Sequence, residues 1–303
     1  MSKRVLDIND LNVGFSSYGE TTKIVTDVSF HIDEGETVGI VGESGCGKSM
    51  TALSIMRLIK CPPGYIKGEI RLNGKNLLEL SERQMCDVRG KDVSMIFQEP
   101  MTSLNPVITV GKQLMEVFRS HEKMTREEAW KKSVEALELV KIASPEQRMK
   151  EYPHQLSGGM RQRVMIASAL ACQPELLIAD EPTTALDVTI QAQILDLIRQ
   201  MKERSGTTVL LITHDMGVVA GLAQRIVILY AGCVMETGTT DEIFYQPAHP
   251  YTKGLQKASP RLDEMGGGRL YTIEGTPPEL IAPEPGCPFA PRCPLAEERC
   301  RRE

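Results

Sequence analysis

The eight residues from Gly42 to Ser49 have the types and the spacing that chemistry on a nucleotide requires. They read Gly-Glu-Ser-Gly-Cys-Gly-Lys-Ser and match the phosphate-binding pattern G-x-x-x-x-G-K-S/T at every fixed position. Glycines let the backbone wrap around a triphosphate with its N–H groups pointing inward. Lys48 would bring a positive charge to the β- and γ-phosphates, and the Ser49 hydroxyl is suited to bind Mg²⁺.

The sequence around this loop predicts the elements that must hold it. Residues 37–41 indicate a buried strand entering the loop, and residues 50–59 indicate a helix leaving it. The positive N-terminal end of such a helix favours an anion, which a chance glycine-rich turn would not offer. We therefore expect a triphosphate to contact the loop and the first residues of its helix, namely Gly42, Ser44, Gly45, Cys46, Gly47, Lys48, Ser49 and Met50.

Two adjacent carboxylates follow another apolar strand. Residues 176–179 read Leu-Leu-Ile-Ala, and Asp180 and Glu181 come directly after them. Asp180 is suited to the ligand shell of Mg²⁺. Glu181 could orient and polarise an attacking water as a general base. The alternative is a solvated acidic turn, which the phosphate loop earlier in the chain makes the weaker interpretation.

A second anion cradle is predicted at Ser157, Gly158 and Gly159, just before a helix over residues 161–171. Its backbone N–H groups and the Ser157 hydroxyl are suited to bind phosphate. A single nucleotide site has no need of two such cradles in one chain. We therefore expect this cradle to grip a nucleotide that is held by a different subunit.

The remaining sequence indicates the scaffold. The chain has 303 residues, of which 41% are hydrophobic, and this suffices for a large core. Residues 5–32 predict short alternating strands, and residues 98–157 are mainly helical in pattern, with Trp130 packed inside that insert. Strands that alternate with helices over residues 161–230 imply a mainly parallel sheet covered on both faces.

Charge and hydropathy argue against two classes of protein. The net charge of −5 lacks the basic excess that marks nucleic-acid binding. No apolar run approaches the roughly 20 residues that span a bilayer, and residues 1–5 lack the apolar segment of a signal peptide. We therefore expect the chain to reside in the cytosol.

Three of the eight cysteines, Cys287, Cys293 and Cys300, are clustered in a proline-rich stretch near the C-terminus. In a reducing cytosol such clustering favours metal over a disulfide. Thiolates without histidine suit an iron–sulfur cluster or zinc. No fourth cysteine follows Cys300, so an iron–sulfur cluster, zinc and no metal stay open as interpretations.

These motifs together resemble the ATPase subunits of ABC transporters. Residues 156–160, Leu-Ser-Gly-Gly-Met, are similar to the family's signature motif, and residues 185–187, Ala-Leu-Asp, to its D-loop, which crosses to the partner subunit. The resemblance implies that Gln98 contacts Mg²⁺ and water and that His214 contacts the γ-phosphate. It also implies that an aromatic residue stacks on adenine; Phe15 is the expected match, with Tyr18 as the alternative.

The resemblance also implies the fold. We expect an α/β P-loop NTPase of the ABC type over residues 1–250, with a mainly parallel core sheet and an N-terminal antiparallel β subdomain. An α-helical subdomain is expected at about residues 100–157. Residues 251–303 would then form a cysteine-containing C-terminal extension.

Within this family, four segments resemble the peptide importers of bacteria. They are an extended Q-loop at 95–106, the signature region at 152–160, a His-Pro-Tyr element at 248–253 and the cysteine-rich tail at 285–294. This resemblance implies that Cys287, Cys293 and Cys300 hold a four-iron (4Fe-4S) cluster. The same group includes importers of nickel and of some saccharides, so the cargo stays open between these and dipeptides or oligopeptides.

The function that the resemblance implies is ATP hydrolysis that drives import. Lys48, Gln98, Glu181 and His214 would carry catalysis, with Mg²⁺ held by Ser49, Gln98 and Asp180. Two such subunits, identical or related, would sandwich two ATP molecules at the cytoplasmic face of the plasma membrane and move two permeases. An extracellular or periplasmic substrate-binding protein would take part indirectly, and nucleic acid would not. The rival interpretations are an ABC-type ATPase of DNA repair or translation, and a redox sensor built on the tail thiols.

Overall fold

A computed structural model of the protein describes residues 3–17, 20–99, 103–184, 187–259, 271–278 and 285–302. The chain divides into two compact units. The first combines Met1–Glu79 with Leu211–Glu303, and the second is Leu80–Leu210. No helix among the described residues is long and apolar enough to cross a membrane.

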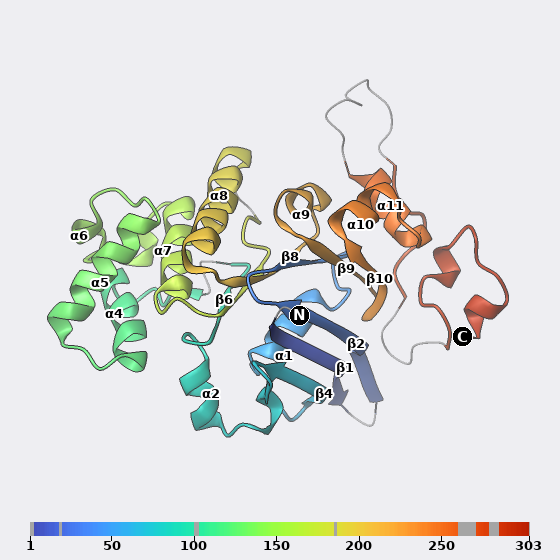
Figure 1. Ribbon diagram of the computed structural model, residues 1–303, viewed down its shortest axis with the longest axis horizontal. Helices are drawn as coiled ribbons and strands as arrows, with labels where there is room; N and C mark the ends of the chain where they lie inside the picture. Colours follow the sequence, from blue (N-terminus) through green and yellow to red (C-terminus); the bar gives the residue numbers. More distant parts are fainter. Residues whose placement is uncertain are drawn as a thin grey trace. The chain divides into compact units, whose positions relative to one another are not determined.

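The first unit contains a four-stranded antiparallel sheet in the order β2-β1-β4-β5; Figure 1 draws β1 and β2 in dark blue and β4 in teal. Its strands are β1 (Arg4–Ser17), β2 (Glu20–Asp33), β4 (Gly64–Leu72) and β5 (Lys75–Asn76). The sequence predicted several short strands where β1 and β2 run on for 14 residues each. Register shifts interrupt the pairing of β1 with β2. Each strand continues through these shifts because a bulge absorbs an extra residue without ending the strand.

A second set of strands in this unit carries the phosphate-loop segment. Strand β3 (Thr37–Val41) pairs in parallel with β9 (Arg225–Tyr230), which pairs antiparallel with β10 (Cys233–Thr239). All five residues of β3 are buried, as the apolar run predicted. Helix α9 (Met216–Leu222) packs on β3, and α10 (Thr240–Tyr245) packs on β10.

Helix α1 (Lys48–Ile55) follows the phosphate loop and is shorter than the predicted helix over residues 50–59. Arg57 adopts a left-handed backbone conformation, with φ of 49°, and two prolines follow at positions 62 and 63. A left-handed residue ends a helix, and prolines cannot continue one. The sequence pattern of apolar residues therefore extended beyond the real helix end.

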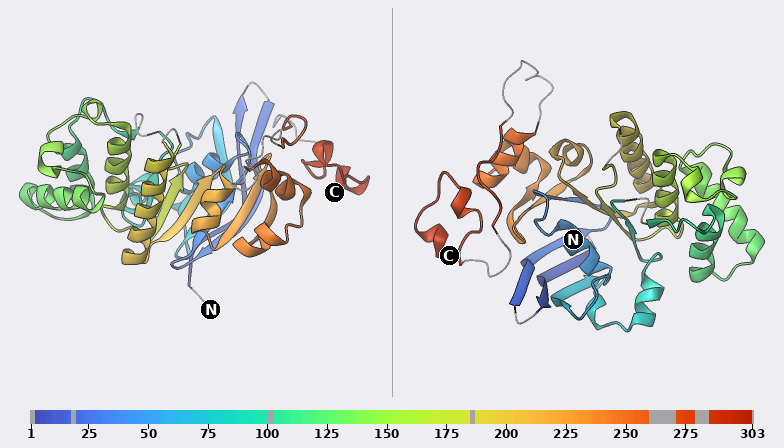
Figure 2. Two further views of the ribbon diagram at one scale, coloured as in Figure 1. Left: turned by 90° about the horizontal axis from the view of Figure 1, so that it is seen from above. Right: turned by 180° about the vertical axis from the view of Figure 1, so that it is seen from behind.

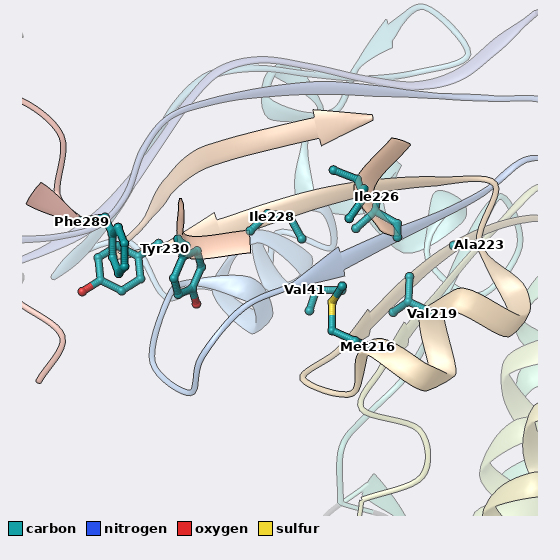
Figure 3. Packing of buried hydrophobic residues seen from close by; sticks show 10 residues of the cluster. Val41, Met216, Val219, Ala223, Ile226, Ile228, Tyr230 and Phe289 are labelled. Carbon is teal, nitrogen blue, oxygen red and sulfur yellow. The ribbon is translucent and has the colours of Figure 1, made fainter. Parts of the chain in front are cut away.

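The C-terminal part of the first unit packs onto a buried aromatic cluster. Helix α11 (Pro250–Ala258) contacts β10, and short 3-10 helices follow at η4 (Ala290–Arg292) and η5 (Arg299–Arg301). Phe289, with 2% of its surface exposed, joins Tyr230 and Tyr251 in this cluster. Figure 3 shows the Tyr230 and Phe289 rings against each other, with centroids 5.3 Å apart. The C-terminal segment thus shares a core with β9.

The second unit combines two parallel strands with a set of helices. Strand β6 (Val93–Ile96) pairs in parallel with β7 (Leu176–Asp180). Helices α4, α5 and α7 contact one another and lie together in every view of Figures 1 and 2. The α-helices among the described residues of this unit are α2 (Glu82–Val88), α4 (Val110–His121), α5 (Arg126–Leu139), α6 (Pro145–Arg148), α7 (Gly158–Leu170) and α8 (Val188–Ser205).

The remaining elements are short or lie at the boundary of the units. Strand β8 (Thr208–Thr213) is fully buried, and the division of the chain into two units falls within it, between Leu210 and Leu211. Two 3-10 helices complete the described elements, η1 (Leu77–Glu79) and η2 (Pro153–Gln155). In the helical region, Trp130 is half-buried, which agrees with the packing role predicted for it.

Candidate functional site

The phosphate loop bends between β3 and α1 at positions that require glycine. Gly47 is the N-cap of α1 and has φ of 100°, a conformation that residues with a side chain rarely adopt. A Cβ atom at Gly47 would lie 2.9 Å from the carbonyl oxygen of Ile24. One at Gly42 would lie 2.1 Å from the carbonyl oxygen of Leu229. The backbone of the loop is therefore fixed by close contact with neighbouring strands.

Lys48 lies inside the loop with 5% of its surface exposed. Its Nζ donates to the carbonyl oxygens of Gly42 at 2.8 Å and Glu43 at 3.0 Å. A buried ammonium needs such partners because removing it from water is costly. Burial raises the pKa of the neighbouring Cys46 thiol, so this thiol is neutral and carries no charge that would offset that of Lys48. That charge is suited to bind phosphate oxygens.

The other predicted loop residues lie around Lys48. Ser44 and Gly45 are exposed, and Ser49 and Met50 are half-buried in the first turn of α1. The first N–H groups of a helix have no partner within the helix, and together with its dipole they attract an anion. The loop therefore combines backbone donors, a cation and a hydroxyl, as the sequence predicted for a triphosphate site.

In the second unit, the structure brings together two residues that are far apart in the sequence. Gln98, after β6, donates from Nε2 to Oε2 of Glu181 at 3.0 Å. The Thr184 hydroxyl donates to the same oxygen at 2.8 Å. Gln98 and Glu181 meet because β6 and β7 are adjacent parallel strands that end at the same edge. The two hydrogen bonds orient the Glu181 carboxylate. An oriented carboxylate of this kind can accept a proton from water.

The two acids differ in their surroundings. Asp180 is the last residue of β7 and is 4% exposed. Glu181 has a left-handed backbone conformation, with φ of 44°, and is half-buried. This turn separates the carboxylates, so that one belongs to the strand and the other to the loop after it. Residues other than glycine rarely adopt a left-handed backbone conformation, and those that do often lie at functional sites.

The second predicted cradle lies at the start of helix α7. Ser157 is its N-cap, and the Ser157 hydroxyl accepts a hydrogen bond from the Met160 N–H at 3.3 Å. Ser157 and Gly158 are exposed, and a Cβ atom at Gly158 would meet nothing within 4 Å. The N-terminus of this 13-residue helix is therefore open to an anion that approaches from outside the chain.

The other predicted site residues are placed as follows. His214 is exposed directly after β8, and Asp215, which follows it, caps helix α9. Phe15 is half-buried in β1 opposite Gly64. The alternative aromatic residue Tyr18, the first two D-loop residues and residues 100–102 of the extended Q-loop lie outside the described residues.

The predicted iron–sulfur cluster is wrong. Among the described residues, no group of three or more His, Cys, Asp or Glu side chains is placed to hold a metal ion. Cys287 and Cys293 instead pack against the aromatic cluster of the first unit, and the Cys287 N–H donates to the carbonyl oxygen of Cys300 at 2.8 Å. These three cysteines have free thiols, and two of them act as small apolar residues that attach the tail to the core.

The structure also shows a link between the tail and the phosphate loop that was not predicted from the sequence. Arg292 donates from Nη1 and Nη2 to the Glu43 carboxylate, at 2.8 and 3.2 Å. The Glu43 N–H donates to the Tyr251 hydroxyl at 3.0 Å. In the sequence Arg292 lies between Cys287 and Cys293, and no local pattern marks it as a partner of Glu43.

Comparisons with known proteins agree with this geometry. The ABC transporter family model matches residues 25–184, and the model of the oligopeptide/dipeptide transporter C-terminal region matches residues 235–300. The oligopeptide transport ATP-binding protein OppD of Bacillus subtilis is 56% identical over 95% of this chain and 81% of its own length. The dipeptide transport ATP-binding protein DppD of the same organism is 54% identical over 99% of this chain and 90% of its own length.

Solved structures give the same result for the fold. The dimeric ATP-binding cassette MJ0796, in a post-hydrolysis state bound to ADP and Pi, superposes with a TM-score of 0.70 and 29% sequence identity. The match covers 78% of this chain and 98% of that one. The predicted α/β P-loop fold, with parallel core strands, an antiparallel β subdomain and helices, is thereby confirmed. The chain belongs to the ABC transporter family of ATP-hydrolysing cassettes.

Proposed function

We propose that this protein is the ATP-hydrolysing subunit of a bacterial importer of dipeptides or oligopeptides. The observation that carries the proposal is the combination of a complete phosphate loop with the C-terminal region at residues 235–300. Relatives of high identity over nearly the whole chain are named for peptide transport. Nickel and saccharide import are the alternatives within the same group of importers.

The proposed chemistry depends on charge and on the position of a water. Lys48, inside the loop, neutralises negative charge on the β- and γ-phosphates of ATP. Glu181, held by Gln98 at 3.0 Å, orients the attacking water and accepts its proton. His214 contacts the γ-phosphate in this proposal, and Phe15 stacks on the adenine. Hydrolysis then removes the γ-phosphate contact.

Mg²⁺ is the metal that the proposal requires. Ser49, Gln98 and Asp180 offer hydroxyl, amide and carboxylate oxygens, which are the donors that Mg²⁺ prefers. When bound, the ion supplies further neutralisation of the phosphate charge. The burial of Asp180 at the end of a strand supports its assignment, because such a carboxylate is held in one place.

The proposed assembly uses two cassettes. The exposed start of helix α7 grips the nucleotide bound to the partner cassette, and the phosphate loop of this chain is covered in return by the partner. Two permeases at the cytoplasmic face of the plasma membrane receive the motion, and a substrate-binding protein outside delivers the cargo. In this scheme residues 1–250 form the ATPase domain, about residues 100–157 form the helical subdomain that conveys the motion, and residues 251–303 form the C-terminal extension.

Uptake by living cells tests the proposal. Cells that lack this chain should lose uptake of a radiolabelled dipeptide or tripeptide, and the wild-type chain should restore it. The Lys48→Ala variant should be made at the same level and should not restore it. If uptake of the peptides is unaffected while uptake of radioactive nickel or of a labelled saccharide is lost, the peptide assignment is wrong.

A further inference from the structure

Glu43, the second residue of the phosphate loop, is held at three points. Its backbone N–H donates to the Tyr251 hydroxyl at 3.0 Å. Its carbonyl oxygen accepts from Lys48 Nζ at 3.0 Å. Its carboxylate accepts two hydrogen bonds from Arg292, at 2.8 and 3.2 Å. Two of these three contacts come from the C-terminal extension, more than 200 positions along the chain.

Arg292 is itself fixed from several sides. Its Nε donates to the carbonyl oxygen of Glu274 at 2.9 Å, and its Nη2 donates to that of Ile273 at 3.1 Å. Its Nη1 also donates to the Tyr230 hydroxyl at 3.2 Å. Only 6% of the Arg292 side chain is exposed. A guanidinium with so many partners has one orientation, and its planar fork matches a carboxylate at two points.

The tail around Arg292 is anchored to the core of the unit. Phe289 packs against Tyr230 and Tyr251, with ring centroids 5.3 and 5.2 Å away. The guanidinium carbon of Arg292 lies 5.6 Å from the Tyr230 ring centroid. Tyr251 is fully buried, and burial raises its pKa, so its hydroxyl is neutral and can accept the Glu43 N–H. The extension therefore reaches the loop through rigid groups.

We infer that Arg292 is a positioning residue for ATP binding, which acts from the C-terminal extension through Glu43 on the phosphate loop. The contact does two things. It neutralises a carboxylate that would otherwise face the triphosphate with like charge, and it keeps the loop in one conformation before ATP arrives, which lowers the cost of ordering it on binding. This inference concerns ATP binding and holds for any cargo.

A double-mutant cycle on the full chain tests the inference. The variants are Arg292→Ala, Glu43→Gln and the two combined, and the measured quantity is the Kd for the Mg²⁺ complex of the non-hydrolysable analogue AMP-PNP by calorimetry. Arg292→Ala should raise this Kd about tenfold, since it removes a charge-assisted pair and leaves Glu43 unpaired. Adding Glu43→Gln should recover part of the loss, because the unpaired negative charge is then gone.

The matched control is Arg299→Ala in the same tail. Arg299 forms a surface ion pair with Glu297, and 74% of its side chain is exposed, so its removal should leave the Kd unchanged. Arg292→Lys keeps the charge but loses the two-point geometry, and it should give an intermediate Kd. Circular dichroism of each variant confirms folding. The inference is overturned if Arg292→Ala binds AMP-PNP as wild type does, or if the two substitutions show no coupling.

The turnover of the same variants separates positioning from simple loss of structure. Arg292→Ala should raise KM for ATP while kcat at saturating ATP stays close to that of wild type, because Arg292 touches neither the water nor its base. A fall of kcat at saturating ATP, with KM for ATP unchanged, would contradict the inference.

Discussion

At the scale of single residues, two groups of the candidate site have different chemical properties: the Lys48 ammonium is a cation, and the Glu181 carboxylate is an oriented base. Lys48 is buried and bonded to two carbonyl oxygens of its own loop. In the proposed function, phosphate oxygens would replace these two acceptors. Glu181 receives donors from Gln98 and Thr184, which hold its carboxylate in one orientation. The Lys48 ammonium is suited to bind phosphate charge, and the Glu181 carboxylate is suited to accept a proton.

Replacement of Glu181 by Gln should separate binding from hydrolysis. The amide keeps the size of the side chain but cannot accept a proton from water, so ATP should bind normally while turnover falls about 10²- to 10⁴-fold. Phosphate release measures the turnover, and calorimetry with ATP measures the binding. Glu138→Gln on the exposed face of α5 is the control. Normal turnover of the Glu181 variant would end the general-base assignment.

The residues that the sequence could and could not assign differ in how their contacts arise. Lys48 and Ser49 were assigned from spacing within one loop, and Gln98 and Glu181 were assigned to one site that the parallel strands β6 and β7 then brought to 3.0 Å. Arg292 was not assigned, because its partner Glu43 lies 249 positions away and no local pattern marks either residue. The cysteines misled the interpretation because thiols that are close in the sequence can either bind a metal or pack against aromatic rings, as Cys287 and Cys293 do.

At the scale of elements, helix termini organise most of the candidate site. Helix α1 begins at the phosphate loop, and α7 begins at Ser157. Helix α11 begins after His249, whose Nδ1 accepts the Tyr251 N–H at 3.1 Å. The sequence located the starts of α1 and α7 to within three residues, because capping residues and glycines are local signals, but it predicted no helix where α11 lies. It located the end of α1 less well, because a left-handed residue such as Arg57 has no type-specific signature.

The cap of helix α11 predicts a dependence of stability on pH. Burial lowers the pKa of His249, against an opposing effect of Glu236, and the Nδ1 cap requires an unprotonated ring. The unfolded chain therefore takes up a proton at this position more readily than the folded chain. The contribution of His249 is complete above its unfolded pKa of about 6.5 and is lost as the pH falls towards the lower folded value.

His249→Asn should weaken this pH dependence, since asparagine caps a helix without titrating. The melting temperature of wild type and variant should be compared at pH 7.5 and 5.5. The drop between these values should be smaller in the variant. His31, whose pKa burial also lowers, is present in both proteins and cancels in the comparison. An equal drop in the two proteins would remove His249 from the explanation.

At the scale of the whole molecule, two features of the chain face outward. One is the start of α7 at Ser157 and Gly158, and the other is the part of the phosphate loop at Ser44 and Gly45. The residue before Ser44, Glu43, is bonded to the C-terminal extension. In the proposed assembly the first serves the partner's nucleotide and the second holds the chain's own. The family fold could be predicted from motif order alone, but the attachment of the tail to the loop required coordinates.

Ser157→Asp should distinguish these two roles. Aspartate retains the ability to cap α7 but sets a negative charge against any phosphate that approaches the helix. The isolated chain should bind AMP-PNP with the Kd of wild type. The complete importer should lose at least about tenfold in ATP turnover, as expected for a misplaced charge at a phosphate contact. A weaker Kd in the isolated chain would show that the cradle serves the chain's own nucleotide.

The most direct test of the account is ATP hydrolysis by the importer reconstituted in lipid, with this chain, its partner cassette, the permeases and the peptide-binding protein. The account predicts that peptide-loaded binding protein stimulates hydrolysis, and that Lys48→Ala in this chain removes the stimulation. The account would be contradicted by a rate of ATP hydrolysis that does not change with peptide, or that rises with nickel or a saccharide instead of peptide.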